Sequence, residues 1–498
     1  MNDYDLVIVG DTLAARQGAI AAATEGARVA LIEPDPNHVV QTLNHQALIA
    51  VARQIHQWQT SPIAQFLQPA DGPDSGPDNR NTWADLNAQP LDWSATLGWV
   101  TRISQAAIAA NSLEQLALAG VDTLPGKAQF CAAPRLHVAA ANRTLTARSF
   151  LLLSGFTFKP PAIAGLDQVP HCTPEQLWTW PTLPHRLAIL GGTPTALELA
   201  QTFSTLGVAV TLWLPPDAAL YGHDSSIAHW LIAHLQANGI DVRGEALPQL
   251  LPDSSAPFAS PSPHPHIQLQ FETEKVTVDQ LIVATAPQLR LDGLCLDKLG
   301  IVSDRGTISV NSYLQTLYPN LFVGGTALGQ RGIDAIASQE ITLALKNALL
   351  LPRFSLKPRL LPWTIQLNPE VAIVGVSEAE VKTWYGKDAW VLQTPLFENS
   401  RAQFEGKTIG FCKLVVHQRG EILGAVLVAP NASDLLQPVV QAMEQDLSVD
   451  AIASSPQIPL SWGNIVQQTA DQWRQRKRQP GQWRRDWQEN WFNWQRQD

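Results

Sequence analysis

The sequence predicts an α/β protein with two Rossmann-like domains, because one strand–turn–helix pattern occurs in it twice. In each copy an apolar strand runs into a turn of the form G-x-T-x-x-A, which a helix and a second strand follow. The turns begin at Gly10 and Gly191, which are 181 residues apart (191 − 10). This is the context in which a dinucleotide fingerprint becomes meaningful. A single copy would be a weak indication, whereas two predict two nucleotide-type domains.

The first turn offers the groups that a dinucleotide needs. Gly10 permits the tight turn, Ala15 lets the helix approach the strand, and the helix N-terminus presents N–H groups to a pyrophosphate. Thr12 stands where glycine is usual, so its Cβ crowds the phosphates without excluding them. Glu33 ends the second strand at the spacing of an acid that binds an adenosine ribose. These residues favour FAD or NAD; the alternative for Glu33 is a solvated strand end.

The second turn repeats the backbone pattern without the ribose acid. Gly191, Thr193 and Ala196 correspond to the three positions of the first turn. The strand that follows ends at about Leu214, and two prolines come next. Neither an acid for a ribose nor an arginine for a 2′-phosphate is present, so we expect NAD(P)H binding to be doubtful.

Composition limits the function classes. A chain of 498 residues is long enough for about three domains. A net charge of −10 argues against nucleic acid as a partner. The four cysteines are far apart, which excludes a C-x-x-C metal or redox motif and predicts thiols in a reducing cytoplasm. The chain enters a strand without a signal peptide and has no long apolar run, so we expect no membrane span.

The end of the chain is rich in tryptophan and arginine. Trp483, Trp487, Trp491 and Trp494 follow one another at steps of 4, 4 and 3, which places them on one face of a helix over residues 482–496. This face predicts attachment to a membrane surface, on the cytoplasmic side, or to a protein partner. Packing of the tail on its own domain is the alternative.

From residue 1 to about 475 the chain resembles the flavoprotein disulfide reductases, which include dihydrolipoamide dehydrogenase, glutathione reductase and mercuric reductase. The resemblance rests on the order of several segments. They are the first fingerprint, the strand over 146–155 that ends like the family's A-T-G, the crossover 159–167, the second fingerprint, the return 282–286, the stretch 320–326 that resembles A-x-G-D, and the interface-type segments 369–372, 410–415 and 422–425.

The resemblance implies a fold, a division into domains and a cofactor. The fold is two Rossmann-like domains of the FAD/NAD(P) type plus a C-terminal α+β dimerisation domain, in a homodimer that binds FAD. The implied segments are 1–157 (FAD domain, first part), 158–283 (NAD(P)-type domain), 284–353 (FAD domain, second part), 354–478 (dimerisation domain) and 479–498 (Trp/Arg-rich tail helix). Residues 59–90 and 253–266 look like insertions. Besides the first turn, the implied FAD contacts are Gly155, Gly324, Gly325 and Thr326, the last in place of the family's aspartate.

The residues that carry the family's dithiol chemistry are missing. Residues 36–47, which match the C-x₄-C segment, contain no cysteine, and Gln46 replaces the lysine beside the flavin while its partner Glu198 remains. Ile458 and Gly463 occupy the positions of the family's H-P-x-x-x-E pair. Because a thiolate and a base are both required, the chain is predicted not to reduce disulfides.

Two functions stay open. The first is an FAD-dependent oxidoreductase whose flavin takes a hydride from NAD(P)H, or electrons from another donor, and passes them directly to a small acceptor such as a quinone. Gln46 and Glu198 are its candidates at the flavin edge. The second is a catalytically degenerate FAD-binding scaffold or assembly protein. No residue is assigned a catalytic role, no metal is expected, and His38 and His45 are expected to have surface or capping roles.

Overall fold

The structure, a computed structural model, divides into two compact units, residues 1–356 and 357–498. Some sequence predictions lie outside the described residues. They are Thr326, most of the two insertions and the tail helix of residues 482–496, of which only Trp491 and Arg496 are described. The structure describes residues 2–59, 91–132, 135–215, 225–244, 246–252, 267–271, 274–285, 287–302, 308–325, 334–477, 491 and 496.

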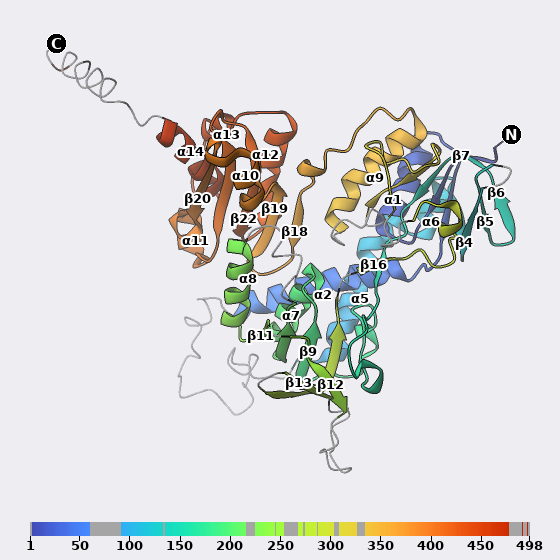
Figure 1. The fold of residues 1–498 in the computed structure, drawn as a ribbon, viewed down its shortest axis with the longest axis horizontal. Helices are drawn as coiled ribbons and strands as arrows, with labels where there is room; N and C mark the ends of the chain where they lie inside the picture. Colours follow the sequence, from blue (N-terminus) through green and yellow to red (C-terminus); the bar gives the residue numbers. More distant parts are fainter. Residues whose placement is uncertain are drawn as a thin grey trace, which may run out of the picture. The chain divides into compact units, whose positions relative to one another are not determined.

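The first domain is built around a five-stranded parallel sheet (Figure 1). Its central strand is apolar and fully buried over residues 6–9, as expected for a strand covered on both faces. Helices α1 (Leu13–Thr24) and α9 (Asp334–Leu349) pack against each other and against the sheet. The strand order is β17 (Leu321–Val323), β7 (Ala147–Leu152), β1 (Tyr4–Val9), β2 (Val29–Glu33), β3 (Asp122–Pro125).

Two further helices and a small sheet complete this part of the chain. Helix α5 (Trp93–Ile108) begins where Asp92 caps it by accepting a hydrogen bond from the Ala95 N–H, and it packs against α2 (His38–Gln59). The remaining elements are α6 (Leu113–Leu118) and the antiparallel strands β4 (Ala128–Cys131), β5 (His137–Ala140) and β6 (Arg143–Leu145).

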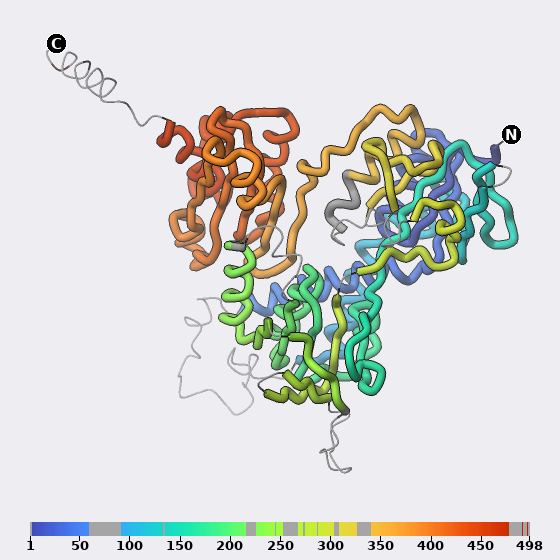
Figure 2. Tube along the Cα trace, in the orientation of Figure 1, coloured from blue at the N-terminus to red at the C-terminus, as the bar shows by residue number. Residues whose placement is uncertain are grey.

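The second domain repeats the parallel architecture with four strands. The chain crosses into it along β8 (Phe156–Phe158) and returns along β16 (Pro287–Leu289), which pairs with β8 (Figure 2). The strand order of its sheet is β11 (Asp241–Arg243), β10 (Ala209–Trp213), β9 (Arg186–Leu190), β15 (Gln280–Val283). The domain also contains helices α7 (Pro194–Thr205) and α8 (Ser225–Ala237). A second sheet consists of β12 (Gln249–Pro252), β13 (Ile267–Gln270) and β14 (Lys275–Val278).

The second unit is an antiparallel sheet covered by helices. One core joins the sheet to α12 (Ala432–Glu444), α13 (Val449–Ala453) and α14 (Asn464–Lys477), and a smaller core lies beneath α10 (Glu378–Tyr385). The strand order is β18 (Trp363–Ile365), β19 (Glu370–Gly375), β22 (Ile422–Ala429), β21 (Phe411–His417), β20 (Ala389–Pro395), and helix α11 (Ser400–Glu405) follows β20.

These units confirm the predicted fold class, two Rossmann-like domains followed by a C-terminal α+β domain. The finer division into five segments stays a prediction. Within the described ranges, none of the helices combines the length and the apolar character that crossing a bilayer requires. Short 3₁₀ helices occupy residues 109–111, 166–168, 177–179, 297–299, 358–360, 386–388 and 396–398.

Candidate functional site

The first fingerprint turn lies at the carboxyl end of β1, where α1 begins. Thr12 caps the helix, because its hydroxyl accepts a hydrogen bond from the Ala15 N–H at 3.1 Å. Gly10 lies so close to β7 that a Cβ there would be 2.1 Å from the Leu153 carbonyl oxygen. Ala15 is fully buried in the core. The three positions therefore build the turn in the way that the fingerprint predicts.

Glu33 ends β2 as predicted, but its carboxylate already has a cationic partner. Arg16 Nε donates to Glu33 Oε1 at 2.6 Å, and Arg16 Nη2 donates to Oε2 at 3.2 Å. Both side chains are about 95% buried. The solvated strand end that the sequence left open is therefore wrong. A ribose at this position would have to share the carboxylate with Arg16, which the sequence analysis did not foresee.

Buried polar groups without hydrogen-bond partners gather at the carboxyl edge of this sheet. Among the described residues they include Asp11 Oδ1 after β1, Ser154 Oγ after β7 and both carboxylate oxygens of Glu340 on α9. Burial raises the pKa of Glu340 to about 8, and the backbone of Gly325 opposes that shift only in part. Such groups are costly unless something binds them. Their position is where the sequence predicts a dinucleotide.

Gly155 is a point of close approach in the same site. It has a φ of +68°, and a Cβ there would lie 3.2 Å from both His38 Nε2 and Thr12 Cγ2. The expectation of a surface role for His38 is wrong, because the side chain is buried, and burial lowers its pKa to about 4. Gly324 and Gly325, after β17, are both buried, and a Cβ on Gly324 would lie 3.3 Å from Leu153.

Helices α2 and α7 bring a histidine and a glutamate together. His45 Nε2 lies 3.0 Å from Glu198 Oε2, and their side chains are 14% and 7% exposed. The surface role expected for His45 is therefore wrong as well. Gln46, the residue that replaces the family's lysine, is exposed on α2. The sequence analysis missed His45 because it lies one residue before the position that the resemblance marks.

The second fingerprint turn is closed by its own hydrogen bonds. Thr193 caps α7 by accepting from the Ala196 N–H at 3.2 Å, and its hydroxyl donates to the Ala284 carbonyl at 3.0 Å. A Cβ on Gly191 would lie 2.1 Å from that same carbonyl oxygen. Leu214 is buried at the strand end. Leu214 itself has no charged group that could bind a ribose or a 2′-phosphate.

The nearest arginine across the strand end is already engaged. Arg243 pairs with Trp213 in the sheet register, and its guanidinium binds Asp241 at 2.8 Å and also Glu274. A 2′-phosphate would have to displace these carboxylates. The second turn thus has the fold of a nucleotide site and little of its chemistry.

The cysteines do not form a redox pair. All four are free; Cys172 and Cys412 are buried, which raises the pKa of each thiol to about 12. A thiol with such a pKa is a poor nucleophile. In the described ranges, no three His, Cys, Asp or Glu side chains are grouped as a metal would require. Ile458 is exposed and carries no acid or base.

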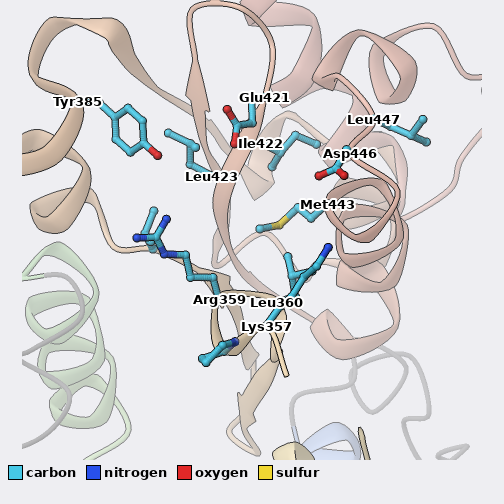
Figure 3. A pocket seen from close by; sticks show the side chains of 12 residues that line it. Lys357, Arg359, Leu360, Tyr385, Glu421, Ile422, Leu423, Met443, Asp446 and Leu447 are labelled. Carbon is cyan, nitrogen blue, oxygen red and sulfur yellow. The ribbon is translucent and has the colours of Figure 1, made fainter. Parts of the chain in front are cut away.

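The second unit has a cavity of its own, with a volume of about 560 Å³ (Figure 3). Met443, Ile422 and Leu423 give it an apolar wall. Charged residues of both signs line it as well: Lys357, Arg359, Glu421 and Asp446. Arg359 stacks on Trp384 with 4.8 Å between the guanidinium carbon and the ring centroid. No histidine or cysteine lines the cavity, so its described walls offer no redox group.

FAD fits the first turn. The fit rests on the partnerless atoms of Asp11, Ser154 and Glu340, and on the glycine positions where a Cβ would collide with the neighbouring strand. The residues that would hold it are the α1 N-terminus around Thr12 for the pyrophosphate and Glu33 for the ribose. The Arg16 partner of Glu33 is compatible with this role, because a carboxylate has several acceptor positions.

Family models match both units of the chain. Residues 4–344 match the pyridine nucleotide-disulphide oxidoreductase model, and residues 361–462 match the dimerisation domain of the same family. The chain is 27% identical to the mercuric reductase of Staphylococcus aureus over 456 residues, which cover 91% of this chain and 79% of that protein. It is 27% identical to the dihydrolipoyl dehydrogenase of Synechocystis over 472 residues, 91% of this chain and 94% of that protein.

Solved structures share the fold. LpdA from Mycobacterium tuberculosis superposes with a TM-score of 0.77 at 21% identity, over 94% of this chain and 99% of that one. RclA from Escherichia coli, a HOCl-induced flavoprotein disulfide reductase, superposes with a TM-score of 0.75 at 21% identity, over 95% of this chain and 100% of that one. At this identity the likeness concerns the fold alone.

Proposed function

The chain belongs to the pyridine nucleotide-disulphide oxidoreductase family, and from that premise we propose that it is an FAD-dependent oxidoreductase that works without a redox dithiol. The observation that carries the proposal is the first half of α2. Residues 38–49 form a continuous helix in which no cysteine stands, although the resemblance places the C-x₄-C pair there. Electrons leaving the flavin would therefore reach the acceptor without passing through a disulfide.

FAD is the family's cofactor, and when bound it can accept a hydride and release the electrons to an acceptor. The chain's own residues would position it. The α1 N-terminus would hold the pyrophosphate, and Gly324 and Gly325 would let it approach the end of β17. The His45–Glu198 pair gives the α2–α7 contact a proton-holding group where the family has a lysine–glutamate pair. Gln46 and Glu198 remain the flavin-edge candidates of the sequence, and His45 joins them.

The acceptor that we propose is small and meets the flavin directly, a quinone being one example. Ile458 and Gly463 offer no acid or base with which a thiol product could be protonated. An acceptor that exchanges electrons and protons with the flavin itself needs no such pair. NAD(P)H is expected to bind weakly as the donor, because Leu214 and Thr193 offer a nucleotide little beyond the turn.

An assembly role without catalysis is the second candidate, and the buried Arg16–Glu33 pair favours it. This pair satisfies within the protein the carboxylate that a ribose would otherwise bind. A scaffold could keep the fold, and even FAD, while losing turnover. If none of a broad set of electron acceptors supports turnover, this candidate is favoured.

Self-association is proposed through the second unit. The family match identifies that unit as a dimerisation domain. Asn399 Nδ2 donates to the Ser461 carbonyl at 3.1 Å, which joins the segment before α11 to the loop that contains Ile458. Large apolar side chains along these segments are more than half exposed, as a homodimer interface requires: Phe397, Phe404, Ile409, Ile458 and Leu460.

Attachment of residues 482–496 to a membrane or partner, in the cytoplasm, is proposed from the sequence alone.

The test of the proposed function is turnover with and without the accessible thiols. We expect flavin absorbance in the purified protein and reduction of a soluble quinone, either with NADH or NADPH as the hydride donor or after the flavin has been reduced by light. We expect no turnover of dihydrolipoamide, glutathione disulfide or mercuric ion. The variant Cys131→Ser/Cys295→Ser removes the two thiols that are not fully buried and should keep the quinone rate. Steady mercuric-ion or disulfide reduction that this variant abolishes would contradict the proposal.

A further inference from the structure

A charged cluster lies at the first fingerprint turn, and the proposed function does not yet use it. Arg290 Nη1 lies 2.9 Å from Asp11 Oδ2, and Arg290 Nη2 lies 3.5 Å from Asp35 Oδ2. The Arg290 backbone N–H donates to the Gly155 carbonyl at 3.3 Å. One guanidinium, from the segment that returns after β16, is thus held between the residue next to Gly10 and the end of β2.

Asp11 is the buried member of this cluster. It is 1% exposed, and Oδ1 has no hydrogen-bond partner among the described residues. Burial raises its pKa to about 6, against the attraction of Arg290, and the Asp35 charge adds to the increase. His38 does not titrate in the same range, because burial lowers its pKa to about 4. The other titratable groups at this site are the Arg16–Glu33 ion pair, whose signs offset each other, and Glu340 on α9, which keeps its proton up to about pH 7 because burial raises its pKa to about 8.

We propose that Arg290 is the phosphate-binding cation of the FAD site and that Asp11 controls it through its protonation. The inference rests on the proposed FAD binding at this turn and names a residue of that site. With Asp11 ionised, two carboxylates face one guanidinium, and a pyrophosphate must compete with both for it. With Asp11 protonated, Arg290 is left with Asp35 alone, and the new O–H can donate to a phosphate oxygen.

The geometry supports this assignment over a purely structural pair. Arg290 keeps 26% of its side chain exposed, so the guanidinium is not enclosed as Arg16 is. The free Asp11 oxygen lies one residue before Thr12, at the helix end to which a phosphate is attracted. At the second turn the corresponding residue is Gly192, and the turn has no such group. The cluster is therefore particular to the first site.

The experiment measures the binding of FAD and of ADP-ribose to the full-length apoprotein across pH. In both ligands the pyrophosphate is a diester and does not titrate near neutrality, and adenosine serves as the probe without phosphate. We expect affinity to fall by up to about tenfold per pH unit above the Asp11 pKa of about 6. Adenosine binding should not change with pH.

Variants identify the groups. Asp11→Asn should remove the fall in affinity between about pH 6 and pH 7, below the range in which Glu340 loses its proton, and at pH 8 it should bind FAD at least about tenfold more tightly than the wild type. Arg290→Gln should weaken FAD binding at pH 5.5 by about tenfold or more, the loss of one charge-assisted hydrogen bond. Asp241→Asn, in the Asp241–Arg243 pair of the second domain, is the matched control and should change neither quantity.

Two outcomes would overturn the inference. If the wild type binds FAD with an affinity that is flat across pH, or if Asp11→Asn keeps the wild-type slope, Asp11 does not control the site and FAD binding itself stands. If neither FAD nor ADP-ribose binds at any pH, the FAD-dependent function fails together with the inference. Circular dichroism of each variant ensures that a loss of binding is not a loss of folding.

Discussion

The two fingerprint turns are similar in sequence and backbone, yet their charged surroundings differ. Each begins with a glycine whose Cβ would lie 2.1 Å from a carbonyl of the neighbouring strand, and each has a threonine that caps the next helix. Among the positions at which they differ, two decide the charge: the first site has Asp11 and Glu33 where the second has Gly192 and Leu214. The turn motif thus specifies the local backbone fold, and the side chains around it decide which ligand binds.

The same difference appears in how the polar groups are satisfied. At the second turn the Thr193 hydroxyl both donates and accepts within the protein. At the first, Asp11, Ser154 and Glu340 have buried atoms that find no hydrogen-bond partner among the described residues. Buried groups of this kind lower stability unless a ligand binds them. We therefore expect substitutions at the first site to change stability and ligand binding together, and those at the second to change stability alone.

The largest expected effect concerns the buried pair for which the second site has no counterpart. Glu33→Ala leaves Arg16 buried without its carboxylate, which should cost about 3–5 kcal/mol of the free energy of unfolding. The double variant Arg16→Leu/Glu33→Leu should recover most of that loss, because no charge remains buried. Asp122→Ala, which breaks a half-exposed pair with Arg143 and removes the acceptor of the Tyr4 hydroxyl, should cost less, about 1–2 kcal/mol. Denaturant unfolding of the apoproteins measures all three, and equal losses in Glu33→Ala and Asp122→Ala would contradict the role of burial.

Glu340 gives the first site a pH dependence with a definite sign. Its pKa is raised from 4.5 to about 8 in the folded protein. Between these values the folded state keeps a proton that the unfolded state has lost, so stability is greatest below about pH 4.5 and falls as pH rises toward 8. The slope is about 1.4 kcal/mol per pH unit at most.

Glu340→Gln isolates this contribution. The glutamine should unfold less readily than the wild type at pH 8 and with little difference at pH 4.5, as measured by denaturant unfolding of the apoprotein at both values. Glu114→Gln, at an exposed position on α6, is the control, and its stability relative to the wild type should not change between the two pH values. A constant difference between Glu340→Gln and wild type across pH would show that the carboxyl does not titrate as stated.

The glycines of the two turns allow a direct comparison. Gly10→Ala and Gly191→Ala each drive a Cβ into a strand carbonyl, and Gly191 has in addition a φ of +147°. Each should lose about 1–3 kcal/mol of unfolding free energy. Only Gly10→Ala should also lose FAD, which the ratio of flavin absorbance to protein measures. Loss of FAD from Gly191→Ala at unchanged folding would mean that the sites are coupled.

Periodicity and turn chemistry predicted the fold because both depend on local sequence. The apolar runs at residues 6–9 and 187–190 predicted buried strands, and the fingerprint turns predicted the helices that follow them. The family resemblance added the antiparallel third domain. Each of these signals lies within a few residues of the element that it specifies.

The environment of the first site could not be predicted because it is assembled from distant segments. Arg290 is 279 residues from Asp11 (290 − 11), and nothing in its local sequence distinguishes it. His45 was expected at the surface or in a cap, because a one-residue shift along α2 decides which side chain reaches Glu198. Glu33 was recognised as a strand-end acid, but its partner Arg16 lies on another element, and nothing in the local sequence connects the two. Pairing of charges across a fold has no periodicity to detect.

The smallest expected effect is the discrimination between NADH and NADPH at the second site. Leu214 is buried and apolar, and Arg243 is bound by Asp241 and Glu274, so the described residues at the strand end that would meet the 2′ position leave no free charge to read it. The two nucleotides should bind weakly and differ by less than about a hundredfold in affinity, which is about 2.7 kcal/mol. Isothermal titration of the FAD-loaded protein with each nucleotide measures this ratio. Leu214→Glu supplies the acid that the first site has in Glu33, and it should favour NADH over NADPH. A wild-type preference above a hundredfold would instead mean that the second turn recognises its ligand through groups other than the strand end, and the contrast between the two turns would fail.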